Sequence, residues 1–320
     1  MTGIAAVVVA YSCQLAVLVF AAWLALILGR VRAPRLRLLH YEATLVAAVV
    51  LLPCLAFADL SIAPPAAVMF NAPQVFAVTT VGADVHPTLL IGPWTIVGVV
   101  LVGGMAVRAT WLAMGLLRLR RIRMAARELH PLPHAVVTLQ ATLGLRARWF
   151  VTDAVAAAAT YGVRSPVVLL PSADLQRDDA ALRAIACHEL RHVARCDWLR
   201  TMGEEVIRTA LWFHPAIWFL VDRIRLCREQ VVDADVIAMT GDRLGYAEAL
   251  IESAATMSNP PLAPAWLHGR HLRIRIASIA AATGGPMSRT RFVSSAVVLV
   301  VVLAAACTWT ACAFPSHDDA

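Results

Sequence analysis

The stretch ACHELRHVARCDW, residues 186–198, sets the interpretation of the whole chain. It places His188 and His192 four residues apart, with Glu189 directly after the first histidine. Residues four apart on a helix lie on the same face, so both imidazoles can point at one ion. Neutral imidazole is a good zinc ligand, and a glutamate one step around the helix can reach a water bound to that ion. The stretch therefore predicts a helix that carries part of a catalytic zinc site.

A third ligand has to come from elsewhere, because catalytic zinc sites keep three protein ligands and one open position. The stretch REQVVDADVIA, residues 228–238, offers Glu229 and Asp233, four apart on an expected helix. One carboxylate can bind the metal while the other accepts the free ring N–H of a ligating histidine. Taken alone, such a pair is more often a solvated helix face. Downstream of an HExxH helix we favour the metal role.

Short apolar runs before the HExxH helix favour strands. They are HAVVTLQ (134–140), ARWFVTD (147–153) and SPVVLLP (165–171), the last ended by a proline that cannot continue a ladder. From Asp178 and Asp179 the pattern becomes helical, and acidic residues in a first turn suit the positive end of the helix dipole. Strands followed by helices predict an α+β domain that is mostly helical.

The composition places this domain in a membrane protein. Hydrophobic residues make up 60% of the 320 residues and charged residues only 15%, whereas soluble domains are about half apolar and a quarter charged. Residues 1–117 are expected to form three transmembrane helices and residues 118–290 the catalytic domain, with a fourth helix in 291–320. The first three helices are expected at about 4–28, 43–60 and 89–107.

The distribution of charge predicts the topology. The chain has 28 basic residues, all of them arginine, and a net charge of +7. Because arginine-rich flanks stay in the cytoplasm, we expect the loop 29–42 and the domain on the cytoplasmic side of the cell membrane. The loop 59–88 and both termini are then external. Anionic lipid headgroups explain the arginines after the third helix, so direct nucleic-acid binding is not expected.

One further apolar run constrains the zinc hypothesis. ALWFHPAIWFLV, residues 210–221, has twelve residues and is broken by Pro215. Runs of this length are core helices or re-entrant segments. If the run crossed the bilayer alone, Glu229 would emerge on the side opposite His192, and no single ion could bind both. We therefore expect it to lie within the domain or to dip into the membrane and return.

Several stretches together resemble one family. HELRHVARCDW resembles the HExxHxxRxD stretch of the BlaR/MecR-type membrane metallopeptidases, bacterial signal transducers that relieve repression of antibiotic-resistance genes. SPVVLLP resembles the strand before their active-site helix. WFHPAIWFLVDRIR resembles the segment between their metal motifs, with His214 where asparagine is usual. The family's sensors carry a penicillin-binding domain after the last membrane helix; this sequence ends six residues past Phe314, so we expect it to lack that domain.

The resemblance assigns roles to individual residues. It implies a gluzincin-like zinc site, with Glu189 as general base. The residues that it implies around the metal are His188, His192 and Glu229 as ligands and Asp233 as their outer partner. Arg195 and Asp197 match motif positions to which we assign a structural role. His214 is a weaker candidate for stabilising the oxyanion of the tetrahedral intermediate.

These observations predict a membrane zinc metalloendopeptidase that hydrolyses peptide bonds in a regulatory protein. By analogy the substrate is a BlaI/MecI-like winged-helix repressor, and self-cleavage between residues 258 and 291 stays open. An HtpX-like quality-control protease is an alternative, although that group usually has two transmembrane helices before the domain. A non-catalytic receptor or scaffold with a structural metal site is another. Cys196, four residues after His192 on the same helix face, could compete as a ligand, but we expect it to be a small buried thiol.

Overall fold

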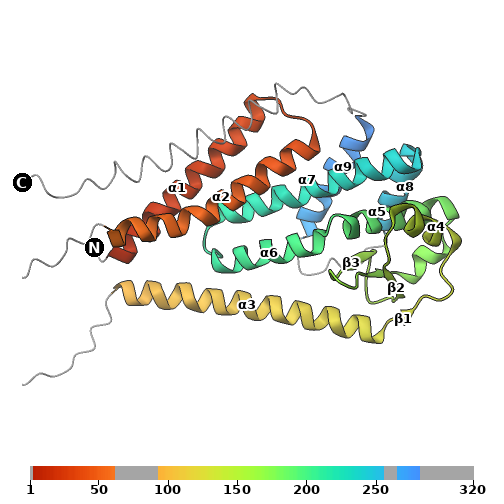
Figure 1. The fold of residues 1–320 in the computed structure, drawn as a ribbon, viewed down its shortest axis with the longest axis horizontal. Helices are drawn as coiled ribbons and strands as arrows, with labels where there is room; N and C mark the ends of the chain where they lie inside the picture. The colour runs from red at the N-terminus through yellow and green to blue at the C-terminus, as the bar shows by residue number, and fades with distance from the viewer. Residues whose placement is uncertain (1–2, 62–92, 256–264, 282–320) are drawn as a thin grey trace, which may run out of the picture.

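The computed structural model describes residues 3–61, 93–255 and 265–281 of the chain (Figure 1). The helices in these ranges are α1 (Gly3–Leu28), α2 (Pro34–Ser61), α3 (Pro93–Ala125), α4 (His134–Leu143), α5 (Asp179–Ala194), α6 (Asp197–Ala210), α7 (Pro215–Thr240), α8 (Arg243–Ala255) and α9 (Ala265–Ala280), with a short 3-10 helix at Ser172–Gln176. Helices and one small sheet confirm the predicted α+β class. The expected fourth transmembrane helix at 291–320 and most of the loop 59–88 lie outside the described residues.

The sheet has the strand order β1-β2-β4-β3. Its strands are β1 (Arg127–Glu128), β2 (Arg148–Val151), β3 (Ala159–Tyr161) and β4 (Val167–Leu170). β2 and β4 pair in parallel, while β1 and β3 pair antiparallel to their neighbours. The runs ARWFVTD and SPVVLLP therefore form strands, as predicted. β3 lies at one edge of the sheet, next to α5.

The prediction of a strand at HAVVTLQ is wrong, because these residues belong to helix α4. Val136 and Leu139 are buried three residues apart, which is helical and not strand spacing. Gly144 then ends the helix in the left-handed conformation, with a φ of 62°. A short run of valines fits either structure, and the burial of one helical face decides between them.

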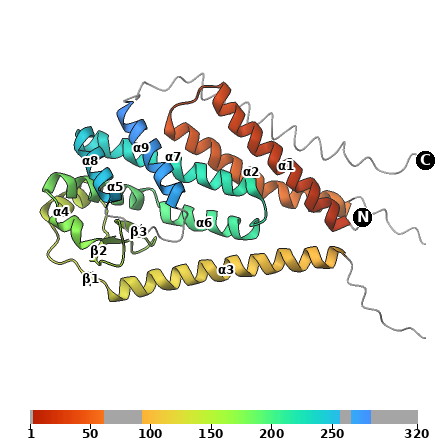
Figure 2. The same cartoon turned by 180° about the vertical axis from the view of Figure 1, so that it is seen from behind.

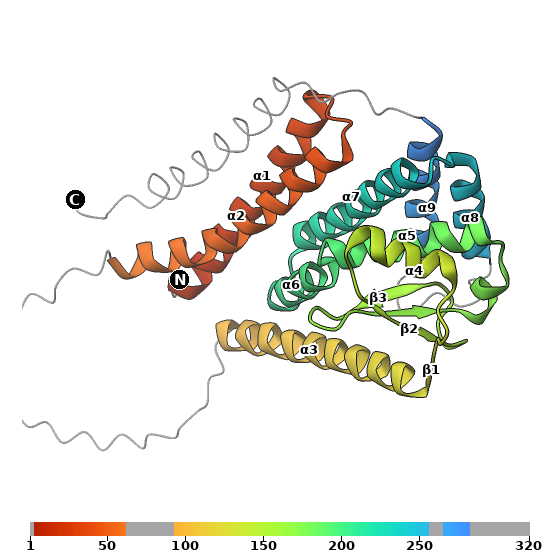
Figure 3. The ribbon, with the colours of Figure 1, turned by 45° about the vertical axis from the view of Figure 1, so that its right-hand side comes forward.

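The two faces of the sheet are covered by different parts of the chain (Figure 3). Trp149 and Val168 pack on one side with α4, α5 and α7. Phe150 and Leu169 pack on the other side with residues of the α3 end, including Ile122. The sheet is thus held between the HExxH helix and the end of α3. This packing fixes the position of β3 relative to the HExxH motif.

α1 and α2 form a helical pair that shares a hydrophobic core with α7 (Figures 1 and 2). The residues of this core include Leu15 and Leu18 of α1, Tyr41 and Leu45 of α2, and Leu220, Ile224 and Val231 of α7. Arg35 of α2 also binds Asp235 of α7, which accepts a second hydrogen bond from Arg191 of α5 at 3.1 Å. The amino-terminal helices therefore pack directly on the helix that carries Glu229.

α3 packs against α6, and most of its side chains are not covered by other parts of the protein that the structure describes. Its stretch Thr95–Ala125 and the Val8–Leu28 stretch of α1 are long and apolar enough to cross a membrane. Side chains such as Val99 and Val102 are more than 60% exposed, which suits lipid better than water. Among the described residues only these two stretches meet that test, so the expected crossing within α2 stays a prediction.

The apolar run 210–221 is divided between two helices that form a hairpin. It contains the end of α6, the turn at 211–214 and the start of α7. Pro215 occupies the first turn of α7, where its missing N–H costs nothing. Because the chain reverses at this turn, α7 returns alongside α5. The run is therefore not one continuous helix, and Glu229 lies on the same side of the hairpin as His192, as the zinc hypothesis requires.

The tip of this hairpin lies between α1 and α3. His214 Nε2 is 3.0 Å from the Ser12 carbonyl oxygen, and the Trp212 indole N–H donates to the Leu101 carbonyl oxygen at 3.0 Å. A Cβ added at Gly104 would stand only 2.1 Å from Cζ2 of Trp212. The docking of α3 on the hairpin thus depends on a glycine at this position.

We expect Gly104→Ala to destabilise the protein in detergent, because the new methyl group collides with the rigid indole of Trp212. Gly103→Ala is the matched control, since a Cβ there meets nothing within 4 Å. Both changes gain about 1 kcal/mol of helix propensity, so the difference between their melting temperatures isolates the collision. Equal melting temperatures would contradict this packing.

Candidate metal centre

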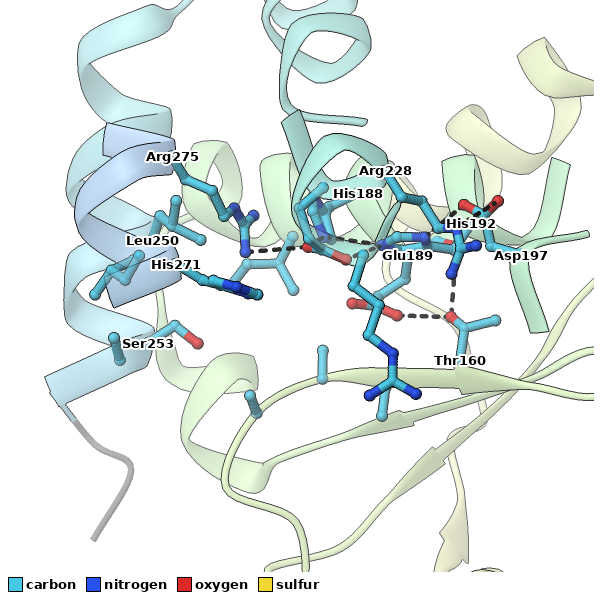
Figure 4. A pocket seen from close by; sticks show the side chains of 18 of the residues that line it. Thr160, His188, Glu189, His192, Asp197, Arg228, Leu250, Ser253, His271 and Arg275 are labelled. Atoms are coloured by element: carbon cyan, nitrogen blue, oxygen red, sulfur yellow. Dashed lines mark hydrogen bonds and ion pairs between the residues drawn. The ribbon is translucent and has the colours of Figure 1, made fainter. Parts of the chain in front are cut away.

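Helix α5 presents the HExxH motif to a cleft. Asp178 caps the helix, and its side chain accepts a hydrogen bond from the Ala181 N–H at 3.0 Å. Cys187 and Leu190 are fully buried beneath the helix. The spacing that buries them turns His188 and His192 the other way, toward the cleft (Figure 4).

Three potential ligand atoms converge at this point. The two Nε2 atoms of His188 and His192 are 3.1 Å apart. The carboxylate oxygens of Glu229, on α7, lie 3.5 Å from the first and 3.6 Å from the second. Ligand atoms of a tetrahedral zinc ion with Zn–N bonds of 2.0–2.1 Å stand about 3.3 Å apart. The spacing therefore fits one metal ion bound by all three residues.

Hydrogen bonds to the outer ring nitrogens fix the tautomers. His192 Nδ1 is 2.9 Å from Asp197 Oδ2, and His188 Nδ1 is 2.9 Å from the Tyr246 hydroxyl oxygen. An oxygen acceptor at each Nδ1 favours the tautomer that carries its proton there, and in that tautomer each Nε2 keeps its lone pair for a metal. Two lone pairs and a carboxylate then face one another, a set of donor atoms that suits a metal cation.

The pKa shifts of these groups have the same origin. Burial alone would lower the pKa of His192, but Glu229 and the neighbouring carboxylates outweigh burial and raise it. Burial alone would raise the pKa of Glu229, but Arg275 and the two histidines hold it well below its usual value. Glu229 is therefore an anion, and the cleft stabilises positive charge beside it.

Glu189 is buried under the ligands and is oriented by the edge strand. Its Oε2 accepts a hydrogen bond of 2.6 Å from the Thr160 hydroxyl, on β3 (Figure 4). A carboxylate held in this way beside an open ligand position can accept a proton from water bound there. Thr160 was not predicted, because no local pattern marks a threonine that meets a helix across the sheet edge.

Asp197 is more than the structural residue that the sequence suggested. Its buried carboxylate accepts from His192 and also from the Nε of Arg195 at 3.3 Å. Arg228 Nε lies 3.6 Å from its other oxygen. These contacts outweigh the effect of burial and hold the pKa of Asp197 below its usual value. Asp197 is thus the outer carboxylate partner of one candidate ligand.

Asp233 reaches the other histidine through an intermediate. Its Oδ1 is 3.8 Å from His188 Nδ1, and the Tyr246 hydroxyl stands between them and donates to that oxygen at 2.6 Å. The expected direct contact from carboxylate to imidazole is therefore replaced by a tyrosine bridge. Burial, and next the Asp233 charge, raise the pKa of Tyr246 well above its usual value, so the phenol keeps its proton.

Two weaker candidates lie elsewhere. His214 is at the hairpin tip, where its Nδ1 accepts from the Ala216 N–H at 3.2 Å and caps α7. It does not line the cleft, so an oxyanion role has no support. Cys196 was expected on the ligand face of the helix, which is wrong. α5 ends at Ala194, and Cys196 is exposed in a left-handed turn with a φ of 53°.

The cleft itself has a volume of about 740 Å³. Small residues of the strand β3 and the loop before it, Ala157 to Thr160, form one wall. Apolar side chains of α5, α8 and α9 contribute to the rest, among them Ile185, Leu250 and Leu272. The ligand atoms lie in this cleft, where a peptide could reach them.

The HExxH helix beside a small sheet, with three candidate ligands at one point, has the features of a metallopeptidase. The sequence model of the family described as BlaR1 peptidase M56 matches residues 8–279, and the chain belongs to this family. That match covers the amino-terminal helices as well as the domain, in agreement with the resemblance found in the sequence. No curated protein gives a match to the chain.

We expect Thr160→Val to lower peptidase activity roughly tenfold, the size of one lost hydrogen bond to a charged group. The residue keeps its shape but no longer orients Glu189, while the ligand set is unchanged. Metal content should therefore equal that of the unaltered protein, and Thr160→Ser should restore most of the activity. Full activity in Thr160→Val would show that the contact does not orient Glu189.

Proposed function

We propose that the chain is a zinc metalloendopeptidase that hydrolyses peptide bonds of a regulatory protein close to a bacterial membrane. The observation that carries the proposal is the convergence of His188, His192 and Glu229 around one point, with Glu189 beside it. A purely structural metal site would need a fourth protein ligand. In the parts of the chain that the structure describes, the metal-ligand cluster has these three members and no fourth.

The residues have distinct tasks in this mechanism. His188, His192 and Glu229 would hold zinc, which when bound acidifies a water molecule and polarises the scissile carbonyl. Glu189 takes the proton of the attacking water and passes it to the leaving amine. The hydrogen bond from Thr160 holds the Glu189 carboxylate in the orientation needed to take that proton.

The edge strand supports an extended substrate. β3 lines the cleft, and β4 is its sheet neighbour among the described strands. A peptide in extended conformation can add to such an edge through main-chain hydrogen bonds. The methyl side chains of Ala157 to Ala159 leave room for it, and the apolar wall favours a large hydrophobic residue near the scissile bond. We therefore propose an unfolded or loop segment as the substrate, in a BlaI/MecI-like repressor by analogy.

The membrane arrangement is proposed on the same basis. The apolar, uncovered surface of α3 supports a crossing by that helix, and α1 meets the same requirements of length and composition. The contacts of the 211–214 turn with Ser12 and Leu101 support a hairpin that dips between them and returns. We propose that α2 and residues 291–320 complete four crossings, with the cleft on the cytoplasmic side and both termini outside.

The proposal is tested by one substitution and one metal measurement. Purified protein should contain about one zinc per chain, and removal of zinc by a chelator should abolish cleavage of an unfolded protein such as casein. Glu189→Gln keeps the shape and the ligands, so it should retain zinc and lose cleavage. Unchanged cleavage by Glu189→Gln would rule out the enzymatic assignment.

A further inference from the structure

A closed ring of contacts joins two of the three candidate ligands. His188 Nδ1 meets the Tyr246 hydroxyl at 2.9 Å, and that hydroxyl donates to Asp233 at 2.6 Å. Arg275 donates to both oxygens of Asp233, at 2.7 Å and 2.9 Å, and its Nη1 is 3.1 Å from Glu229. Glu229 in turn lies 3.5 Å from His188 Nε2. Four helices, α5, α8, α7 and α9, each contribute to the ring.

Burial and paired hydrogen bonds hold the residues of the ring in place. Asp233 and Tyr246 are almost wholly buried, and the Arg275 side chain is only 13% exposed. A guanidinium that binds both oxygens of a carboxylate has a fixed plane, unlike an ammonium group. The remaining nitrogen of that plane, Nη1, lies 3.1 Å from Glu229 Oε2. Figure 4 shows Arg275 at the edge of the site. Arg275 thus links the carboxylate of Asp233 to the carboxylate of Glu229.

We infer that Tyr246 and Arg275 are positioning residues for the metal site: Tyr246 fixes the plane and tautomer of His188, and Arg275 fixes the carboxylate of Glu229. The inference rests on the proposed zinc site and adds the two residues that shape it. Neither side chain occupies a ligand position, so each acts through its neighbour. Outer partners of this kind typically contribute 10–100-fold to metal affinity.

The third ligand provides an internal comparison. His192 is supported by a separate branch, formed by Asp197 with Arg195 and Arg228. Its contacts with the ring are at the ligand atoms themselves. If the ring acts as a unit, changes within it should be coupled, while a change in the ring and a change in this branch should be independent.

Charge and position make opposite predictions for Arg275. The guanidinium repels a cation, so its charge alone weakens zinc binding, and Arg275→Met should then bind zinc more tightly. If Arg275 positions Glu229, the same variant should bind zinc more weakly. Arg275→Lys keeps the charge but cannot bind both oxygens of Asp233 at once. If Arg275 positions Glu229, this variant should therefore also bind zinc more weakly. Arg270, exposed on the same helix, gives the control variant Arg270→Met.

The experiment measures zinc affinity of the full-length protein in detergent by competition with a chromophoric chelator. We expect Tyr246→Phe, Arg275→Met and Arg275→Lys each to lose roughly 10–100-fold, and Arg270→Met to match the unaltered protein. The visible spectrum of the cobalt-substituted variants should change as well, since a displaced Glu229 alters the coordination. Tighter binding by Arg275→Met, or full affinity in Arg275→Lys, would overturn the positioning role.

Double variants test the closed ring. Tyr246→Phe combined with Arg275→Lys should lose much less affinity than the product of the single losses, because either change already opens the ring. Tyr246→Phe combined with Arg195→Met should lose the full product. If both double variants lose the full product of their single losses in zinc affinity, the inference that the ring acts as a unit is wrong.

The outcomes separate this inference from the proposed function. If the unaltered protein binds no zinc, the metal site itself fails and the ring has no role. If it binds zinc and Tyr246→Phe binds it equally well, only the ring inference fails. Tyr246→Phe removes one oxygen atom from a packed ring, so this arm remains informative even where the Arg275 variants do not fold.

Discussion

The structure depends on two imidazole lone pairs that face each other across 3.1 Å, with a carboxylate beside them. Their outer nitrogens are occupied by Asp197 and Tyr246, so the rings cannot turn to relieve the arrangement. Such a set of donor atoms is well suited to bind a metal cation at its centre. The packing of α5, α7 and α8 therefore builds a site for a cation, and Glu189, held by the edge strand, adds a base next to it.

The helical hairpin α6–α7 makes this arrangement compatible with a membrane protein. It brings Glu229 back beside the HExxH helix, while its tip touches α1 and α3. The α1–α2 pair shares a core with α7, and Asp235 binds both Arg35 of α2 and Arg191 of α5. The amino-terminal helices and the ligand helices are consequently one packed body.

Local pattern predicted the parts of the site that are close in sequence. The HExxH spacing identified His188, Glu189 and His192, and a second spacing of four identified Glu229 and Asp233. Tyr246, Arg275 and Thr160 could not be found in this way, because each reaches the site from a distant element whose own sequence has no recognisable motif. HAVVTLQ was misassigned because a run of valines has no clear period, and Cys196 because the end of α5 is set by a tertiary turn.

The ligand set is tested most directly by X-ray absorption at the zinc edge of the purified protein. The account predicts two imidazole nitrogens and additional oxygen scatterers, all at about 2.0–2.2 Å. A sulfur scatterer at about 2.3 Å would contradict it, because a cysteine would then hold a ligand position that we assign to Glu229 or to water.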